Sequence, residues 1–328
     1  MESHRMKLLG MTMVLAMLTG IGITHAVAAG NVSAQAVASG IPHDFLYGLS
    51  FEGKHGIAVG DHGLLMDTAD GGATWRKLDK SGVKDGLFSV VRKSGKCMAA
   101  GQQGSIVRSD DCIKWANVPP VTNARMLSIH ANSKGNAYAV GEFGALLKSS
   151  DWGASWNQLA VDWKSILGTE AEPHLYSVNV GEDGSVIVTG EFELIIRSTD
   201  GGLNWGVLHK GERSLFGIHV GENGRMLAVG QEGLILRSVN DGKSWTPIKS
   251  GTSAILTDVW SSPDGQDAIA VGIRTVVTST DSGLTFSPEV SKATTRGMHS
   301  AVKGIEGAEG ARTAFVAGSA GEILKLTF

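Results

Sequence analysis

One short apolar run that ends in glycine recurs seven times along this chain, and no other feature limits the possible folds as strongly. The run reads Ile-Ala-Val-Gly at residues 57–60 and again at residues 269–272. A period near 40 residues, with several strand-like segments in each unit, is typical of a propeller blade. The repeat therefore predicts an all-β fold, a seven-bladed β-propeller of four-stranded blades. Its final glycines, which stand 41, 40, 49, 40, 42 and 46 residues apart, are Gly60, Gly101, Gly141, Gly190, Gly230, Gly272 and Gly318.

Each unit contains four strand-like segments. An apolar segment such as residues 87–90 comes first, the run ending in glycine follows, a third segment such as residues 233–238 comes after a turn, and a tryptophan-bearing segment closes the unit. The 45 glycines, against 7 prolines, suit the many tight turns that this order needs. We expect a small residue in each innermost strand, because bulky side chains would collide where seven strands converge on one axis. Counting along the units assigns this place to Gly48, Ser89, Ser128, Ser177, Gly217, Asp258 and Ser300.

A turn motif, Ser/Thr-x-Asp-x-Gly-x-x-Trp, separates the third and fourth segments. We interpret it as a structural device, in which the short acidic side chain accepts backbone N–H groups and the glycine takes a left-handed conformation. A Ca²⁺ or sugar site is the alternative, but a motif found in almost every unit is more often structural. We expect no metal and no cofactor. The central acceptors of the five copies that keep the spacing are Asp70, Asp151, Asp200, Asn240 and Asp281.

This motif is the Asp box, or bacterial neuraminidase repeat. With the full unit Val-Gly-x-x-Gly-x-Ile-Leu-Arg-Ser-x-Asp-Gly-Gly-x-x-Trp, the chain resembles the photosystem II assembly and stability factor family over about residues 43–328. The resemblance implies a seven-bladed propeller of the thylakoid lumen or periplasm that binds newly made membrane proteins. The expected partner is thus a membrane protein or membrane complex, contacted from its periplasmic side. The Asp box alone is shared with sialidases and other glycosidases.

The N-terminus has the features of a targeting segment. Arg5 and Lys7 precede an uncharged apolar run over residues 8–24, and small residues follow at positions 26, 28 and 29. We predict a signal peptide over residues 1–28 and a single propeller domain over residues 29–328. Cleavage after residue 36 and an uncleaved anchor are alternatives. The mature chain is expected to be a periplasmic, or otherwise extracytoplasmic, monomer without direct membrane insertion, since no later segment has the length of apolar sequence that a span needs.

The last unit stops after its third segment, at residues 321–328. An unpaired apolar edge is an aggregation site, so another segment must cover it. Residues 33–38 lie before the first innermost strand, at the offset that a fourth strand occupies in other units. We therefore predict that an N-terminal strand closes the ring.

Composition and motifs favour a binding protein over an enzyme. The net charge of −3 provides no basic footprint for nucleic acid. A sialidase would need a tyrosine nucleophile and an Arg-Ile-Pro motif, and that tripeptide does not occur. The sequence shows no Ser-His-Asp arrangement, phosphate loop or metal-spaced His/Cys set, so we predict a non-enzymatic protein. A carbohydrate-active or carbohydrate-binding propeller remains the alternative.

Two groups of residues are candidates for partner binding on the propeller face that carries the connections between blades. The turns after the second strands hold Asp61, Glu142, Phe143, Glu191 and Phe192. The one long connection, about residues 161–174, adds Trp163, Ile166 and Leu167. Long loops on rigid scaffolds often bind ligands. The alternative is that this connection merely caps the rim.

A third candidate is a series of basic residues near the ends of the third strands. In the family that the chain resembles, an arginine-rich surface is implicated in partner binding, and these positions look similar. Local pairing with Asp-box carboxylates and loop carbonyls is an equally good interpretation. The series consists of Arg108, Lys148, Arg197, Arg237 and Lys325.

The only two cysteines, Cys97 and Cys112, fall in the second unit, whose Asp box lacks the glycine and is one residue short. A disulfide between them would replace missing turn hydrogen bonds, and an oxidising compartment would permit it. Counting from the turn at residues 101–104 pairs Cys97 with Arg108, so the next turn would have to fold back to bring Cys112 within reach. Buried free thiols are the alternative.

Overall fold

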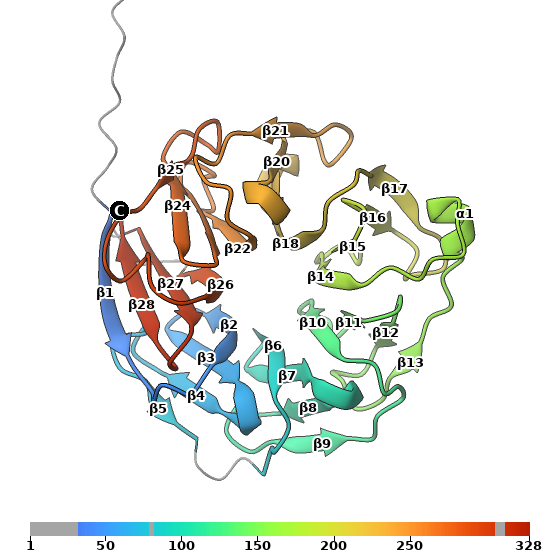
Figure 1. Ribbon diagram of the computed structural model, residues 1–328. Helices are drawn as coiled ribbons and strands as arrows, with labels where there is room; N and C mark the ends of the chain where they lie inside the picture. The colour runs from blue at the N-terminus through green and yellow to red at the C-terminus, as the bar shows by residue number, and fades with distance from the viewer. Residues whose placement is uncertain (1–31, 79–81, 306–311) are drawn as a thin grey trace, which may run out of the picture.

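A computed structural model describes residues 32–78, 82–305 and 312–328. Seven antiparallel sheets of four strands each surround a central axis (Figure 1), which confirms the predicted propeller. We number the blades by their innermost strands, β2 (Leu46–Glu52), β6 (Leu87–Lys93), β10 (Met126–Ala131), β14 (Leu175–Val180), β18 (Leu215–Val220), β22 (Leu256–Ser261) and β26 (His299–Gly304).

In blades 1 to 6 the other strands follow outward in chain order, and blade 7 takes its outer strand from the N-terminal part of the chain. The second strands are β3 (His55–Gly60), β7 (Lys96–Gly101), β11 (Ala137–Gly141), β15 (Val186–Gly190), β19 (Met226–Gly230), β23 (Ala268–Gly272) and β27 (Thr313–Gly318). The third strands are β4 (Leu65–Thr68), β8 (Ile106–Ser109), β12 (Leu146–Ser149), β16 (Ile195–Ser198), β20 (Ile235–Ser238), β24 (Thr275–Ser279) and β28 (Ile323–Thr327). The outer strands are β5 (Arg76–Lys77), β9 (Ala116–Val118), β13 (Asn157–Gln158), β17 (Gly206–His209), β21 (Thr246–Ile248), β25 (Ser287–Pro288) and, for blade 7, β1 (Ser33–Ala38).

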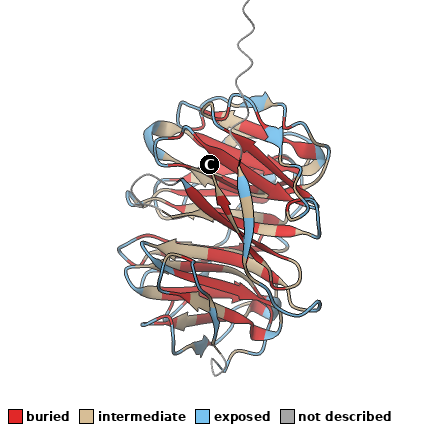
Figure 2. Cartoon of the chain, turned by 90° about the vertical axis from the view of Figure 1, so that its left-hand side faces the viewer, coloured by how far each residue is buried: buried red, intermediate tan, exposed pale blue. Residues whose placement is uncertain are grey.

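The second strands form the most buried layer, and the glycine that ends each of them is required by close packing. A Cβ atom on Gly60 would lie 1.9 Å from the carbonyl oxygen of Phe45, just before β2, and one on Gly272 would lie 1.9 Å from that of Ile255. Gly60 has a φ of −161°, which any residue adopts, so the constraint is space and not conformation. Figure 2 shows the buried residues concentrated in the strands and the exposed ones in the turns. The repeating glycine thus lets the inner strand pass close to the second.

The inner strands also pack closely against one another across blades. A Cβ atom on Gly48 would lie 3.1 Å from the Cα of Ser89 in the next blade, which explains the small residues expected here. In blade 7 the predicted position was wrong by one residue. Ala301, and not Ser300, pairs with the second strand at this place, because it is the third residue of its inner strand, as Gly48 is in blade 1.

The N-terminal strand closes the ring, as predicted. Strand β1 pairs antiparallel with β28, from Ser33 opposite Thr327 to Ala38 opposite Ile323. Its side chains add to an apolar cluster that contains Leu324 and Leu326 of the same blade. The predicted signal peptide, residues 1–28, lies outside the described residues. Within the described part of the chain, no helix is long and apolar enough to cross a membrane.

Candidate functional site

The propeller has two faces. The mouth face carries the connections between blades and the turns between second and third strands, and the Asp-box face carries the turns at the other ends of the strands. On the mouth face, Glu142 and Glu191 each bind the backbone just before their own inner strand. The N–H of Arg125 donates to Glu142 at 3.2 Å, and that of His174 donates to Glu191 at 2.8 Å. The Arg125 guanidinium also pairs with Glu142, and this pairing holds the pKa of Glu142 below its usual value.

The corresponding carboxylate of blade 1 is bound to a tyrosine. The Tyr47 hydroxyl donates to Asp61 at 3.3 Å. Burial and the neighbouring Asp61 carboxylate raise the pKa of Tyr47 to about 12. The Tyr47 ring stacks on Phe45 with 4.5 Å between ring centroids and meets the edge of Phe88, from blade 2, at 5.2 Å. Blade 1 therefore presents an aromatic group backed by a carboxylate.

A second aromatic group spans blades 3 to 5. Phe143 lies 4.9 Å, centroid to centroid, from the His174 ring, and Tyr176 lies 4.7 Å from Phe216. Phe143 and Phe192 occupy equivalent turn positions, and both adopt positive φ angles, 53° and 62°. Their side chains are 64% and 41% exposed. Large apolar residues are uncommon at positive φ, and exposed apolar side chains often mark interaction sites. We therefore regard both phenylalanines as candidate contact residues.

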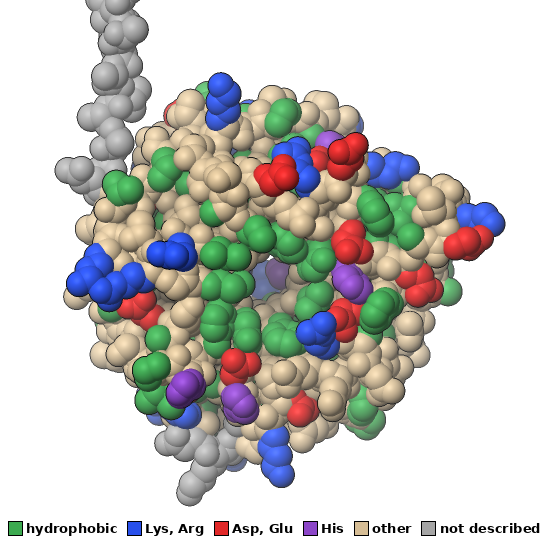
Figure 3. Space-filling view, viewed as in Figure 1, with side chains coloured by type: hydrophobic (Ala, Val, Ile, Leu, Met, Phe, Trp, Pro, Cys, Tyr) green, Lys and Arg blue, Asp and Glu red, His purple; other side chains and the backbone are tan. Residues whose placement is uncertain are grey.

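These groups surround the mouth of a central cavity of about 610 Å³. The second residue of each inner strand lines the cavity, because a bulge leaves that residue out of the pairing with the second strand. Figure 3 shows hydrophobic side chains around the central opening, with acidic, basic and histidine side chains farther out. The second residues are Tyr47, Phe88, Leu127, Tyr176, Phe216, Thr257 and Ser300.

Beyond the mouth, the cavity is lined by charged and histidine side chains. Lys93 pairs with Glu182 at 2.8 Å, and Lys303 pairs with Asp258 at 3.3 Å, so these charges cancel in pairs. Burial, and then the Lys303 charge, lower the pKa of His130 to about 4. The cavity thus changes from aromatic at the mouth to polar towards the Asp-box face.

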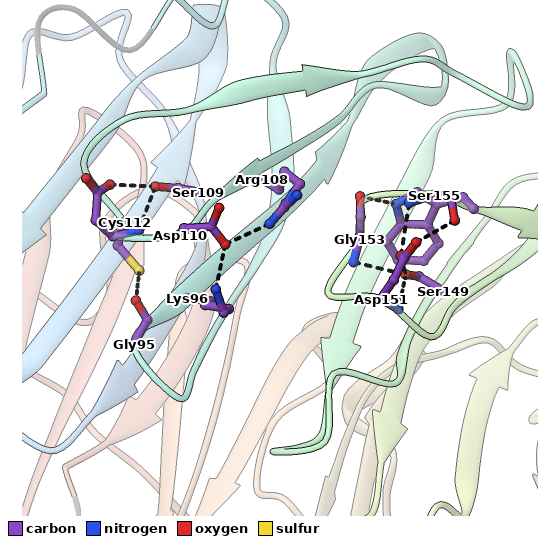
Figure 4. Close-up of polar contacts among 12 residues, drawn as sticks. Gly95, Lys96, Arg108, Ser109, Asp110, Cys112, Ser149, Asp151, Gly153 and Ser155 are labelled. Atoms are coloured by element: carbon purple, nitrogen blue, oxygen red, sulfur yellow. Dashed lines mark hydrogen bonds and ion pairs between the residues drawn. The ribbon is translucent and has the colours of Figure 1, made fainter.

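The Asp boxes use their own polar groups within the turn. In blade 3 the Ser149 hydroxyl donates to Asp151 at 2.7 Å, Asp151 accepts the N–H of Ser155 at 3.0 Å, and the N–H of Gly153 donates back to Ser149 at 2.9 Å (Figure 4). Hydrogen bonds, first of all from Ser155, lower the pKa of Asp151 to about 2. Among the described residues, no group of three or more His, Cys, Asp or Glu side chains is arranged to hold a metal.

The Asp box of blade 2 is completed by a disulfide. Cys97 and Cys112 are bonded, with their Cα atoms 5.1 Å apart. Cys112 has a φ of 59°, and Asp111 accepts the N–H groups of Ile113 and Lys114, each at 2.8 Å. The predicted register was wrong by one residue, because Cys97 pairs with Ser109, and Met98 pairs with Arg108. The turn between the two strands is one residue longer than the count assumed.

The basic side chains of this series bind other groups of the propeller itself. Lys148 donates to the Gly201 carbonyl at 2.8 Å, and Arg237 donates to the Ser282 carbonyl at 2.8 Å. Both acceptors follow the central Asp of the next blade's Asp box.

Two further members of the series form ion pairs. Arg197 makes a double contact with Asp241 of the next blade, the nearer at 2.5 Å, whereas Arg108 pairs with Asp110 of its own blade at 2.7 Å (Figure 4). Local pairing, one of the two interpretations drawn from the sequence, describes these residues.

The long connection between blades 3 and 4 packs onto the propeller. It contains α1 (Trp163–Leu167), which is capped by Asp162 through the N–H of Ser165. Trp163 and Ile166 are buried, and a Cβ atom on Gly144 would meet the Trp163 indole nitrogen at 2.3 Å. Leu167 packs against the same cluster. Trp163 and Ile166 therefore cap the rim, because apolar side chains there are more stable against the blades than in water, and their part in partner binding stays a prediction.

The central part of the chain matches a known family. The model of photosynthesis system II assembly factor YCF48 matches residues 106–266, from the third strand of blade 2 into blade 6. Over those residues the chain is similar to the YCF48 family. The resemblance inferred from its repeats is thereby confirmed. No curated protein sequence matches the chain significantly.

Solved structures agree with the YCF48-like fold. A structure described as YCF48 bound to D1 peptide is 20% identical, with a TM-score of 0.69 over 90% of this chain and 97% of that one. YCF48 from Cyanidioschyzon merolae is 18% identical, with a TM-score of 0.69 over 89% and 98%. A GH74 xyloglucanase from Xanthomonas campestris is 15% identical, with a TM-score of 0.69 over 89% of this chain but 53% of that one. At these identities the likeness shows the fold alone.

One buried residue of this propeller, Glu193, was missed at the sequence level. Glu193 stands where the repeat unit Val-Gly-x-x-Gly has its second glycine, and its φ is 47°. Its side chain lies 3.0 Å from His209 and 2.8 Å from Arg213. The Glu193 carboxylate also fills the space that a Cβ atom on Gly211 would need. The replacement of the repeat's glycine by glutamate was the sequence signal that could have identified this residue. The Glu193 cluster ties the turn that carries Phe192 to the connection into blade 5.

Proposed function

We propose that this chain is an exported, non-enzymatic scaffold that binds a membrane-protein partner through its mouth face. The observation that carries the proposal is the pair of exposed aromatic turn residues, Phe143 and Phe192, on a rigid ring whose Asp-box polar groups are used within the fold. A YCF48 of the same fold is described as bound to D1 peptide, which makes a peptide segment of a membrane protein a reasonable class of partner.

Two further features support export. The N-terminal 28 residues have the composition of a signal peptide, and the disulfide between Cys97 and Cys112 is of a kind that persists in oxidising compartments. Cell fractionation tests this part of the proposal. We expect the protein in the periplasmic fraction, shortened by residues 1–28. Full-length protein in the cytoplasmic fraction would contradict export.

Affinity capture from detergent-solubilised membranes of the source cells tests partner binding. The wild-type mature chain should retain a membrane protein, and the double variant Phe143→Ser/Phe192→Ser should lose it, because the exposed aromatic area on the mouth face is removed. The matched control is Leu203→Ser/Leu284→Ser, which removes two side chains that are 80% and 57% exposed in Asp-box turns. Capture that survives the phenylalanine double variant, or that both double variants abolish, would contradict a binding site on the mouth face.

Turnover assays separate this proposal from a carbohydrate-active enzyme. Glu142 is paired with Arg125, and Glu191 holds a backbone N–H group, so both carboxylates are already engaged. The mature protein should not hydrolyse sialosides, xyloglucan or aryl glycosides. Reproducible hydrolysis that disappears in Glu142→Gln or Glu191→Gln would replace the scaffold with a glycosidase.

A further inference from the structure

The turns of the mouth face carry more negative charge than their hydrogen bonds require. In blade 2 the N–H of Gly86 donates to the side-chain oxygen of Gln102 at 3.2 Å, and in blade 5 that of Ser214 donates to Gln231 at 2.9 Å. The equivalent residue of blade 4 is Glu191, which accepts the same backbone bond. A neutral amide accepts this backbone hydrogen bond in two blades. The negative charge of Glu191 is therefore not needed for the bond.

Only some of these carboxylates are neutralised by the protein itself. Glu142 pairs with Arg125, whereas Asp61 and Glu191 form no ion pair among the residues that the structure describes. Asp61 binds the Tyr47 hydroxyl, and the negative charge of Glu191 contributes to the raised pKa of Tyr176, after the effect of burial. Two carboxylates that have no basic partner among the described residues therefore lie beside tyrosines that line the cavity.

The two tyrosine–carboxylate pairs lie far apart around the mouth. Tyr47 and Asp61 belong to blade 1, and Tyr176 and Glu191 belong to blade 4, three blades further around a ring of seven. Both tyrosines line the same central cavity as Phe88 of blade 2. Aromatic faces attract cations, and nearby carboxylates strengthen that attraction. These aromatic and acidic residues at the mouth, which we call the collar, thus have the chemistry to bind a cation. The collar comprises Tyr47, Asp61, Phe88, Tyr176 and Glu191.

We propose that the mouth binds a lysine or arginine side chain of an extended partner segment, which lies across the collar and against Phe143 and Phe192. This inference rests on the proposed scaffold function and names the chemistry of its partner. Towards the other face, Lys93 and Lys303 line the cavity and are each balanced by a carboxylate. The cationic side chain would therefore be held at the mouth, because the carboxylates that line the cavity farther in, among the described residues, are each paired with a basic side chain.

The test uses the mature protein and three acetylated, amidated peptides of identical sequence except for the central residue, which is arginine, citrulline or glutamate. Binding is measured by isothermal titration calorimetry at low and high salt. The arginine peptide should bind about tenfold more tightly than the citrulline peptide, as expected for a desolvated cation on aromatic faces. The glutamate peptide should bind most weakly, and added salt should reduce the advantage of arginine.

The double variant Asp61→Asn/Glu191→Gln should bring the ratio of the arginine to the citrulline affinity close to one. The variant keeps the acceptor oxygens, as Gln102 and Gln231 do naturally, so the fold should persist. The matched control is Asp70→Asn/Glu222→Gln, which removes the same charge from the Asp-box face, where Asn240 already serves in one box. The control should leave the ratio unchanged.

The outcomes separate the two proposals. No saturable binding of the arginine peptide, an arginine-to-citrulline ratio near one in the wild type, or an equal effect of the control variant would overturn the cation collar. Capture of a membrane partner that is undiminished in Asp61→Asn/Glu191→Gln would also overturn the collar and leave the scaffold function standing. Failed capture with a preserved peptide preference would overturn the scaffold function alone.

Discussion

At the scale of single residues, the Asp box shows how one side chain organises a turn. The carboxylate of Asp151 accepts a backbone N–H and two hydroxyl groups, and Asn240 keeps the equivalent backbone bond from Ser244 at 3.0 Å. An amide can therefore preserve the geometry but not the charge. The conserved function of the motif within this chain is to satisfy a turn that has few backbone partners of its own.

We expect Asp151→Ala to lower the free energy of unfolding by about 1 kcal/mol at pH 7, as for the loss of a helix cap, and Asp151→Asn to cost less. The pKa of Asp151 is lowered from 3.8 to about 2, so the stabilisation by its charge is complete above about pH 5 and is lost as the pH falls through about 2. Urea unfolding at pH 7 and near pH 2 measures both effects. An alanine variant as stable as the wild type at pH 7 would show that the turn does not depend on this side chain.

At the scale of elements, each blade combines one buried sheet with turns that depend on local devices. Blade 2 replaces part of its Asp box with the disulfide between Cys97 and Cys112, 15 residues apart. Blade 7 obtains its outer strand from the opposite end of the chain, since β1 pairs with β28. Both devices compensate for a unit in which the repeat is incomplete.

Removing the disulfide should lower stability by about 3 kcal/mol in the chain-entropy model for a loop of this size. The double variant Cys97→Ser/Cys112→Ser and the reduced wild-type protein should unfold at similar, lower urea concentrations, because both lack the same constraint. Reductant should have no further effect on the double variant. Equal stability of the oxidised and reduced wild-type proteins would mean that the cross-link contributes nothing to the native blade.

Removing β1 should destabilise the whole ring, because β28 would become an unpaired edge. A chain that begins at residue 39 should unfold at a lower temperature than one that begins at residue 32, and it should aggregate at lower concentration. Thermal unfolding and light scattering measure the two effects. Identical melting temperatures for the two truncations would contradict a closing role for β1.

At the scale of the whole molecule, the ring gathers polar side chains around a central cavity, where they are partly buried. His130 and His219 both line the central cavity. Burial, followed by the Lys303 charge, lowers the pKa of His219 to about 3. For His130, Lys93 also lowers the pKa, and Glu182 opposes both lysines. Their position in the cavity therefore keeps both histidines neutral in the folded protein above about pH 4.

These histidines should make the fold sensitive to mild acid. The unfolded chain takes up protons as the pH falls below 6.5 while the native cavity does not, so stability should fall between about pH 6.5 and 4 by at most about 1.4 kcal/mol per pH unit for each histidine. Urea unfolding at pH 7.5 and 5 should show a smaller difference for His130→Asn/His219→Gln than for the wild type. His43→Gln/His62→Gln, which changes two exposed histidines, serves as the control. If the cavity variant showed the same stability difference between pH 7.5 and 5 as the wild type, the lowered pKa values of His130 and His219 would be contradicted.

The sequence by itself determined the fold, because the spacing of Gly60 and its six equivalents follows from a steric limit that repeats in every blade. It also indicated the closing strand and the proximity of the two cysteines, since both depend on order along the chain. Tertiary structure alone decided the side chains' surroundings. Trp163 and Ile166 are apolar and lie in a long loop, a pattern that fits a contact surface as well as a rim cap, and only their burial distinguishes the two.

The same reason applies to the candidate site. The sequence named Asp61, Glu142 and Glu191 as turn residues, but which carboxylate is neutralised depends on Arg125, 17 positions before Glu142 and brought beside it by the fold. The aromatic lining of the mouth, such as Tyr47 and Phe88, was not visible, because a bulge in each inner strand turns those side chains to the axis. Spacing along a chain determines which strands pair, whereas charge pairing and exposure arise between residues that only the closed ring brings together.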